Sequence, residues 1–179
     1  MLPFSIVVAF SNKQRGIGYK NEIPWKISKD MKNFKVLTTT IKNPSKDKNA
    51  IIMGRKTYDS LPHLLPGRLN IVISKNQDLV KNPNIIIASS LENAFEMLKS
   101  VINIDQIFVI GGESIYKEAI LLPNCEKIYA TVIEEPENTM YDTFFPEIPP
   151  PFLLDFETVK TTENQYNFHF SEYHKKIVE

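Results

Sequence analysis

The sequence predicts an α/β fold, with helices on both faces of a largely parallel sheet and an antiparallel hairpin at the C-terminal end. The first observation is that short apolar runs typical of buried strands alternate with segments of helical periodicity. Right-handed crossovers between such strands build a parallel sheet. The second observation is that the alternation stops after Asp155, where two strand-like runs flank the polar segment 162–165 and end near Tyr173.

Six runs rich in β-branched and aromatic residues are expected to be strands. Each is bounded by Gly, Pro, Asn or Ser, and together they are Phe4–Phe10, Ala50–Met53, Leu69–Ile73, Asn84–Ala88, Gln106–Ile110 and Lys127–Ile133. Because these runs are apolar throughout rather than alternating with polar residues, we expect both of their faces to be covered.

The first helix is expected from about Ile27 to Thr39, where an apolar stripe recurs every three or four residues and consists of Ile27, Met31, Phe34 and Leu37. Asp30 stands at the edge of this stripe. A carboxylate there loses water, and its pKa rises unless a cation or a hydrogen-bond donor compensates. Position alone also allows an ordinary solvated charge, which the helix dipole favours in a first turn.

Two further helices follow from local signals. One is expected over Leu91–Val101, with Ser89 and Glu92 as a capping box at its start. The other opens after Gly111-Gly112 and ends before Pro123, which cannot continue a helix.

Composition limits the possible functions. The 179 residues are 42% hydrophobic, enough for one core, so we expect a single domain over residues 1–179. Lysine plus arginine equals aspartate plus glutamate at 21 each, so no summed charge attracts nucleic acid or an anionic membrane, and neither is an expected partner. The single cysteine, Cys125, allows no intrachain disulfide and fits a reducing, cytoplasmic location.

Metal and hydrolytic chemistry have no support in the sequence. The histidines, which are His63, His169 and His174, lack metal-ligand spacing, so no metal site is expected. No Ser or Cys stands in a nucleophile elbow.

Two strand-to-helix turns could hold phosphate. Gly111-Gly112 and the segment Met53–Thr57 each run from a strand into a helix, and the second adds Arg55 and Lys56. Each alone is also typical of an ordinary turn or of surface charges. Together, and with Ser74-Lys75 at the carboxyl end of another strand, they favour a phosphate-bearing cofactor.

The link between the first strand and the first helix is long. It contains Gly16-Ile17-Gly18 and Ile23-Pro24-Trp25, and links of this length are uncommon unless they are functional or mobile. Its glycines allow the segment from Asn12 to Trp25 to act as a lid, although Trp25 could also serve only to cover the core.

In this order and spacing, the segments resemble the dihydrofolate reductase family over essentially the whole chain. The resemblance is carried by Gly16-Ile17-Gly18, Ile23-Pro24-Trp25, Asp30 with Phe34, Met53-Gly54-Arg55-Lys56-Thr57, Leu65-Pro66-Gly67-Arg68, Ile110-Gly111-Gly112 with Tyr116, and Asp142-Thr143-Phe144-Phe145-Pro146. It implies an eight-stranded, mostly parallel sheet in which NADPH and 7,8-dihydrofolate meet in a cleft. It also implies NADPH-dependent reduction to 5,6,7,8-tetrahydrofolate, which feeds one-carbon and thymidylate metabolism, and binding of antifolate inhibitors.

The resemblance assigns roles residue by residue. The expected catalytic residues are Asp30, Trp25 and Thr131, with Thr131 hydrogen-bonded to Asp30. Arg68 is expected to pair with the α-carboxylate of the glutamate tail. The full expected substrate-binding set is Val7, Val8, Asp30, Met31, Phe34, Leu61, Leu65, Arg68, Ile110, Tyr116 and Thr131.

The cofactor set is likewise implied by the resemblance, including a cis peptide at Gly111-Gly112. Arg55, Ser74 and Lys75 are expected at the adenosine 2′-phosphate. The full set is Ala9, Ile17, Gly18, Gly54, Arg55, Lys56, Thr57, Ser74, Lys75, Ile110, Gly111, Gly112, Glu113, Ser114, Ile115 and Tyr116.

Two other functions stay open at this point. The related reductase of riboflavin synthesis shares the fold and NADPH, although Asp30 with Phe34 argues against it. A nucleotide-sensing module on the same scaffold would bind without turnover. The sequence is also compatible both with a free enzyme and with the reductase half of a longer chain carrying a thymidylate synthase domain.

Overall fold

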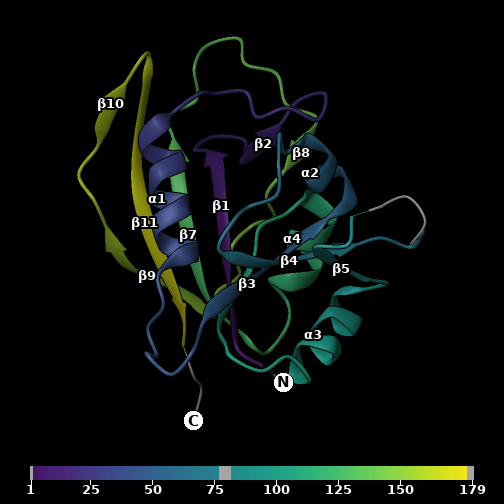
Figure 1. Cartoon of the computed structure of the whole chain (residues 1–179). Helices are drawn as coiled ribbons and strands as arrows, with labels where there is room; N and C mark the ends of the chain where they lie inside the picture. Colours follow the sequence, from purple (N-terminus) through teal and green to yellow (C-terminus); the bar gives the residue numbers. More distant parts are fainter. Residues whose placement is uncertain (1, 77–81, 177–179) are drawn as a thin grey trace.

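A computed structural model of the chain describes residues 2–76 and 82–176, so residues 1, 77–81 and 177–179 of the predicted domain lie outside the description. Its core is a mixed sheet (Figure 1). From β11 across to the edge strand β5 the order is β11-β7-β1-β6-β3-β4-β5. These strands are β11 (Tyr166–Lys175), β7 (Cys125–Ile133), β1 (Phe4–Ser11), β6 (Ile104–Val109), β3 (Lys48–Gly54), β4 (Arg68–Ile73) and β5 (Ile85–Ala88).

All pairings from β7 to β5 are parallel, whereas β11 runs antiparallel to β7. Beyond β11, β9 (Phe152–Glu157) and β10 (Thr161–Glu163) pair with different stretches of the same strand. They share one edge position, so the described sheet is eight strands wide although it contains nine strands. The predicted mostly parallel sheet with a terminal antiparallel hairpin is therefore confirmed, with the first arm of the hairpin divided into two strands.

The helices cover both faces of the sheet. They are α1 (Ser28–Thr39), α2 (Arg55–Ser60), α3 (Leu91–Lys99) and α4 (Glu113–Ala119). Side chains of β1 alternate between the faces, so Ile6 and Val8 join the core under α3 and α4, while Val7 joins the opposite cluster with Phe34 of α1. This alternation explains why the strands read as continuously apolar.

The long link after β1 is more ordered than its sequence predicts. Gly16–Gly18 forms the short strand β2, which pairs antiparallel with β8 (Thr143–Phe144). Asp142 reinforces the pairing, because its amide donates to the Gly18 carbonyl at 3.0 Å. The partner segments are far apart in the sequence, so no local pattern could indicate this pairing.

The start of α3 corrects one prediction. The N-cap is Ser90 rather than Ser89, and the Ser90 Oγ accepts a hydrogen bond from the Asn93 amide at 3.0 Å. In return, the Asn93 side chain accepts from the Ser89 amide at 3.0 Å. Ser90 and Asn93 thus replace the predicted pair Ser89 and Glu92, and the return hydrogen bond goes to the residue before the N-cap rather than to the N-cap itself.

The apolar stripe of α1 is also narrower than predicted. Met31 is 58% exposed and lines a cleft, whereas Phe34 and Leu37 pack toward the sheet.

Among the described residues, no helix has both the length and the apolar character that crossing a bilayer requires.

Asn49 anchors the end of α1 to the sheet. Its buried side-chain amide donates to the carbonyls of Thr38 at 3.0 Å and Thr40 at 2.9 Å, and its oxygen accepts from the Gln106 amide at 3.0 Å. One side chain therefore joins α1, β3 and β6.

Replacing Asn49 with alanine should lower the free energy of unfolding by about 3 kcal/mol, because three backbone groups lose this partner in a buried region. Chemical denaturation measures the change. The matched control is Asn84→Ala, which removes an exposed amide and should change the free energy by less than about 0.5 kcal/mol. Equal losses in both variants would contradict the anchoring role.

Candidate active site

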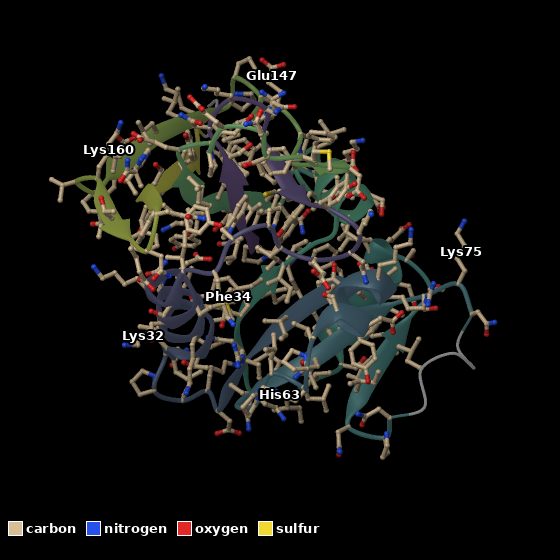
Figure 2. All side chains as sticks on the ribbon, turned by 90° about the horizontal axis from the view of Figure 1, so that it is seen from above. Lys32, Phe34, His63, Lys75, Glu147 and Lys160 are labelled. Atoms are coloured by element: carbon tan, nitrogen blue, oxygen red, sulfur yellow. The ribbon has the colours of Figure 1, made fainter. Side chains whose placement is uncertain are left out.

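A cleft of about 1750 Å³ lies along the carboxyl ends of the parallel strands. Segments at the ends of β1, β3, β4, β6 and β7 all contribute to it, together with α1 and the link before α1. Open α/β sheets bind ligands at this edge, where loops from neighbouring strands converge. Figure 2 places Phe34 near the centre of the molecule and Lys75 at its periphery, and both line the cleft.

The cleft brings together every residue predicted to bind substrate or cofactor except Arg68. Arg68 lies directly behind the lining and is only 8% exposed. Its guanidinium is 5.8 Å from the centre of the Phe34 ring, and it donates to the Thr38 hydroxyl at 2.8 Å and to the Pro66 carbonyl at 3.0 Å. No described carboxylate forms a salt bridge with it, and burial lowers its pKa. This cation therefore lacks an anionic partner beside the cleft.

Asp30 lies in the first turn of α1 and faces β7. The Thr131 hydroxyl donates to its carboxylate at 2.6 Å, which is the hydrogen bond that the resemblance implies. Burial raises the pKa of Asp30, and the hydrogen bond from Thr131 offsets part of that rise. The solvated-charge alternative for Asp30 is therefore excluded. The site thus holds a partly buried carboxyl group that water stabilises less than at the surface and that can accept hydrogen bonds from a ligand.

Tyr116 connects α4 to β1 at the cleft. Its buried hydroxyl donates to the Val7 carbonyl at 2.8 Å. Burial raises the pKa of this phenol, and the nearby Asp30 charge raises it further. Tyr116 therefore stays neutral and acts as a fixed hydrogen-bond donor.

Two glycine turns meet at the centre of the cleft. The Gly111-Gly112 peptide is cis, as the resemblance implies, and the Gly54 amide donates to the Gly111 carbonyl at 2.7 Å. A Cβ on Gly111 would come within 3.1 Å of the Tyr116 ring, and Gly111 has a φ of +118°. A Cβ on Gly112 would lie 3.2 Å from the Thr57 hydroxyl. A side chain would therefore be strained at Gly111 and would crowd Thr57 at Gly112, and both positions leave backbone at the cleft surface.

These turns fit the phosphates of a dinucleotide. Gly54 and Gly112 are the N-cap residues of α2 and α4, and neither N-terminus carries a side-chain cap. Backbone N–H groups at such a start remain available to an anion. The group that the resemblance implies therefore fits the residues present.

The cations near this region are not equally available. Arg55 forms a salt bridge with Asp59, one turn later on α2, at 2.9 Å. Lys56 and Lys75 are exposed, while Ser74 is buried and its hydroxyl donates to the Asn76 carbonyl at 2.7 Å. Within the described ranges, no cluster of three or more His, Cys, Asp or Glu side chains could hold a metal ion.

Trp25 closes the end of the cleft near α1. It is 7% exposed and packs in one cluster with Ile27, Ile133 and Phe168. Its buried indole Nε1 has no hydrogen-bond partner among the described residues. A buried donor without a partner beside a ligand cleft fits a water or ligand acceptor.

Some lining residues were not predicted. Leu37 lines the cleft one turn after Phe34, and its place on the apolar stripe was a usable signal. Ser60 and Ser90 also line it, but nothing local distinguishes them from ordinary helix ends. Glu163, from the distant hairpin, contacts the start of α1, which no sequence pattern indicates.

Comparisons with known proteins agree with this geometry. A sequence profile of the dihydrofolate reductase family matches residues 3–175. A dihydrofolate reductase of Drosophila melanogaster is 37% identical over 85% of this chain and 84% of its own length. One from Heliothis virescens is 35% identical over 94% of this chain and 96% of its own length.

Longer proteins match as well. The bifunctional dihydrofolate reductase-thymidylate synthase of Daucus carota is 37% identical over 95% of this chain. The chain spans only about a third of the length of that protein and of its counterpart in Zea mays. The profile match covers nearly all of the chain, and the chain belongs to the dihydrofolate reductase family.

Proposed function

We propose that this chain reduces 7,8-dihydrofolate to 5,6,7,8-tetrahydrofolate with NADPH. The observation that carries the proposal is the desolvated Asp30 carboxyl, held by Thr131, in one cleft with the cis-glycine turn. The Asp30 carboxyl suits a flat heterocycle with adjacent N–H donors, and the glycine turn suits the phosphates of a dinucleotide. Family membership supports the same pairing.

The substrate side follows from chemistry and position. Asp30 accepts hydrogen bonds from the 2-amino group and ring nitrogen of the pterin, since a carboxylate can accept two parallel bonds. Phe34 packs against the aromatic rings. Arg68 lies beside the Phe34 ring and forms no salt bridge with a carboxylate of residues 2–76 or 82–176, so it pairs with the carboxylate of the glutamate tail.

The cofactor side uses backbone more than side chains. The cleft is lined by Gly54–Thr57 and Gly111–Tyr116, which would hold the phosphates, by Ala9 and Ile17, which would contact the nicotinamide, and by Ser74 and Lys75, which would lie near the 2′-phosphate. When bound, the cofactor supplies a hydride from nicotinamide C4 to pterin C6.

The proton required at N5 enters through a water molecule. Asp30 orients and polarises the pterin, and burial raises its pKa, so its carboxyl takes up a proton more readily than that of an exposed aspartate. Trp25 and Phe34 wall this end of the cleft and limit the access of bulk water. Closure of the segment from Asn12 to Trp25 over the ligands stays a prediction.

The setting of the reaction is also proposed. A cytoplasmic location, sensitivity to antifolates and a thymidylate synthase domain in a longer chain fit the family. The bifunctional relatives support the last of these.

Mixing the chain with NADPH and 7,8-dihydrofolate tests the proposal. The expected result is loss of reduced-nicotinamide absorbance with formation of tetrahydrofolate. Binding of both ligands without turnover would support the nucleotide-sensing alternative instead. Turnover only with a ribosylamino-pyrimidine would support the riboflavin-synthesis reductase.

Asp30→Asn should lower turnover by about 100-fold or more, because the amide has no charge to polarise the pterin and only one oxygen to accept its two N–H groups. NADPH binding should change by less than about twofold, since Asp30 does not contact the phosphate turns. Steady-state kinetics and a direct NADPH titration measure the two effects. Equal losses in turnover and cofactor affinity would count against the role assigned to Asp30.

The same substitution should raise thermal stability at neutral pH. Burial raises the pKa of Asp30 in the folded state above its value in the unfolded chain. As pH rises, Asp30 therefore ionises first in the unfolded chain, and the free energy of unfolding of the wild type falls between the two pKa values. Asparagine avoids this cost and still accepts from Thr131. Thermal unfolding between about pH 3 and pH 8 should show the advantage shrinking as pH falls. An advantage that does not depend on pH would exclude Asp30 ionisation as its cause.

Asp59→Asn should tighten NADPH binding by a few-fold and leave NADH binding unchanged. The substitution frees Arg55 from its salt bridge and makes the guanidinium available to the 2′-phosphate. Parallel titrations with both cofactors measure the preference. Glu126→Gln removes an exposed charge near the start of β7 and serves as control. An equal gain for both cofactors would indicate a general charge effect.

A further inference from the structure

The helix that carries Asp30 has no cap of its own. Its N-cap position is Ile27, whose apolar side chain cannot accept a hydrogen bond. The first N–H groups of a helix require acceptors, which Ser, Thr, Asp or Asn at the N-cap usually provide. The acceptors for α1 must therefore come from elsewhere in the fold.

They come from Glu163, at the end of β10. One carboxylate oxygen accepts from the Ser28 amide at 2.6 Å, and the other accepts from the Lys29 amide at 3.0 Å. The Ser28 hydroxyl also donates to the first oxygen. A single carboxylate of the C-terminal hairpin thus accepts hydrogen bonds from the backbone N–H groups of the two residues directly before Asp30.

The hairpin turn holds the preceding segment as well. Asn164 donates from its side chain to the Lys26 carbonyl at 3.1 Å, and the Tyr166 hydroxyl donates to the Pro24 carbonyl at 3.3 Å. Phe168, from β11, packs with Trp25 and Ile27. The backbone from Pro24 to Lys29, which leads into Asp30, is therefore tied to one turn.

Glu163 is charged at neutral pH. Hydrogen bonds from the Ser28 hydroxyl and amide lower its pKa most, and the Lys29 amide and ammonium lower it further. Asp30 accepts a hydrogen bond from the Thr131 hydroxyl, and its charge raises the pKa of Tyr116. The start of α1 thus lies between two carboxyl groups with different environments.

We propose that Glu163 is a positioning residue for Asp30: its carboxylate caps α1 from the C-terminal hairpin and holds the first turn so that Asp30 faces the cleft. The catalytic consequence rests on the proposed function, whereas the capping itself can be measured without turnover.

Three effects of removing the Glu163 charge act in the same direction on Asp30. A negative charge disappears from the start of the helix, and the positive end of the helix dipole loses its compensation. A loosened first turn also admits water to Asp30. Each favours the ionised form, so the pKa of Asp30 falls.

The test compares wild type with Glu163→Gln, Glu163→Asp and the charge-matched control Glu126→Gln. Carbon NMR follows the titration of the Asp30 carboxyl, and hydrogen exchange follows the Ser28 and Lys29 amides. Glu163→Gln should move the Asp30 midpoint to lower pH by roughly a few tenths of a unit and speed amide exchange by about tenfold. The KM for dihydrofolate should rise several-fold, while the KM for NADPH stays constant.

Glu163→Asp separates charge from reach. It keeps the negative charge, but its shorter side chain cannot hold both amides. Exchange and the KM for dihydrofolate should therefore rise, while the Asp30 midpoint should move less than in Glu163→Gln, because only the loosening of the turn acts on it. This variant decides the question if Glu163→Gln fails to fold. Behaviour of either Glu163 variant identical to that of Glu126→Gln would overturn the proposal.

The readouts also separate this inference from the proposed function. If the wild-type chain lacks reductase activity but the Glu163 variants show the expected changes in amide exchange and in the Asp30 titration, the proposed function is refuted and the positioning role stands. If the wild type is active but the Glu163 variants leave exchange at Ser28 and Lys29 unchanged, the positioning role is refuted and the proposed function stands.

Discussion

The geometry of the cleft centres on one short hydrogen bond between a helix and a strand. Thr131, near the end of β7, donates to Asp30 at the start of α1, in a place where burial has removed most of the water. Removing water raises the free energy of the ionised carboxyl, and a single hydroxyl restores only part of the loss. The remaining instability of the ionised form is what makes Asp30 reactive toward hydrogen-bond donors on a ligand.

Such a group must be held by its surroundings, because α1 gains little from its own sequence. The helix lacks a local cap and exposes Met31 and Val36, and its anchors come from other elements. Asn49 holds its C-terminal end against β3 and β6, and Glu163 holds its N-terminal end from the hairpin. The geometry of the site is therefore a property of the whole sheet, from the first parallel strands to the last antiparallel one.

At the glycine turns, the cleft is lined by backbone rather than by side chains. At Gly54, Gly111 and Gly112 backbone approaches backbone, and a Cβ at either residue of the pair would contact Tyr116 or Thr57. Tyr116 links the glycine turns to Asp30, since its hydroxyl holds β1 at Val7 while its pKa responds to Asp30. The acid and the glycine turns are thus two ends of one packed unit, which explains why a single cleft serves both.

The sequence by itself determined the alternation of strands and helices, the glycine turns and the identity of Asp30, because these depend on periodicity and on residue chemistry over a few neighbours. Family resemblance added the pairing of Asp30 with Thr131 and the cis peptide. Only the tertiary structure decided the β2–β8 pairing and the contact of Glu163 with α1, since their partners lie far apart in the chain. It also decided that Arg68 lies behind Phe34 rather than in the lining, because side-chain direction follows from packing between elements and not from local spacing.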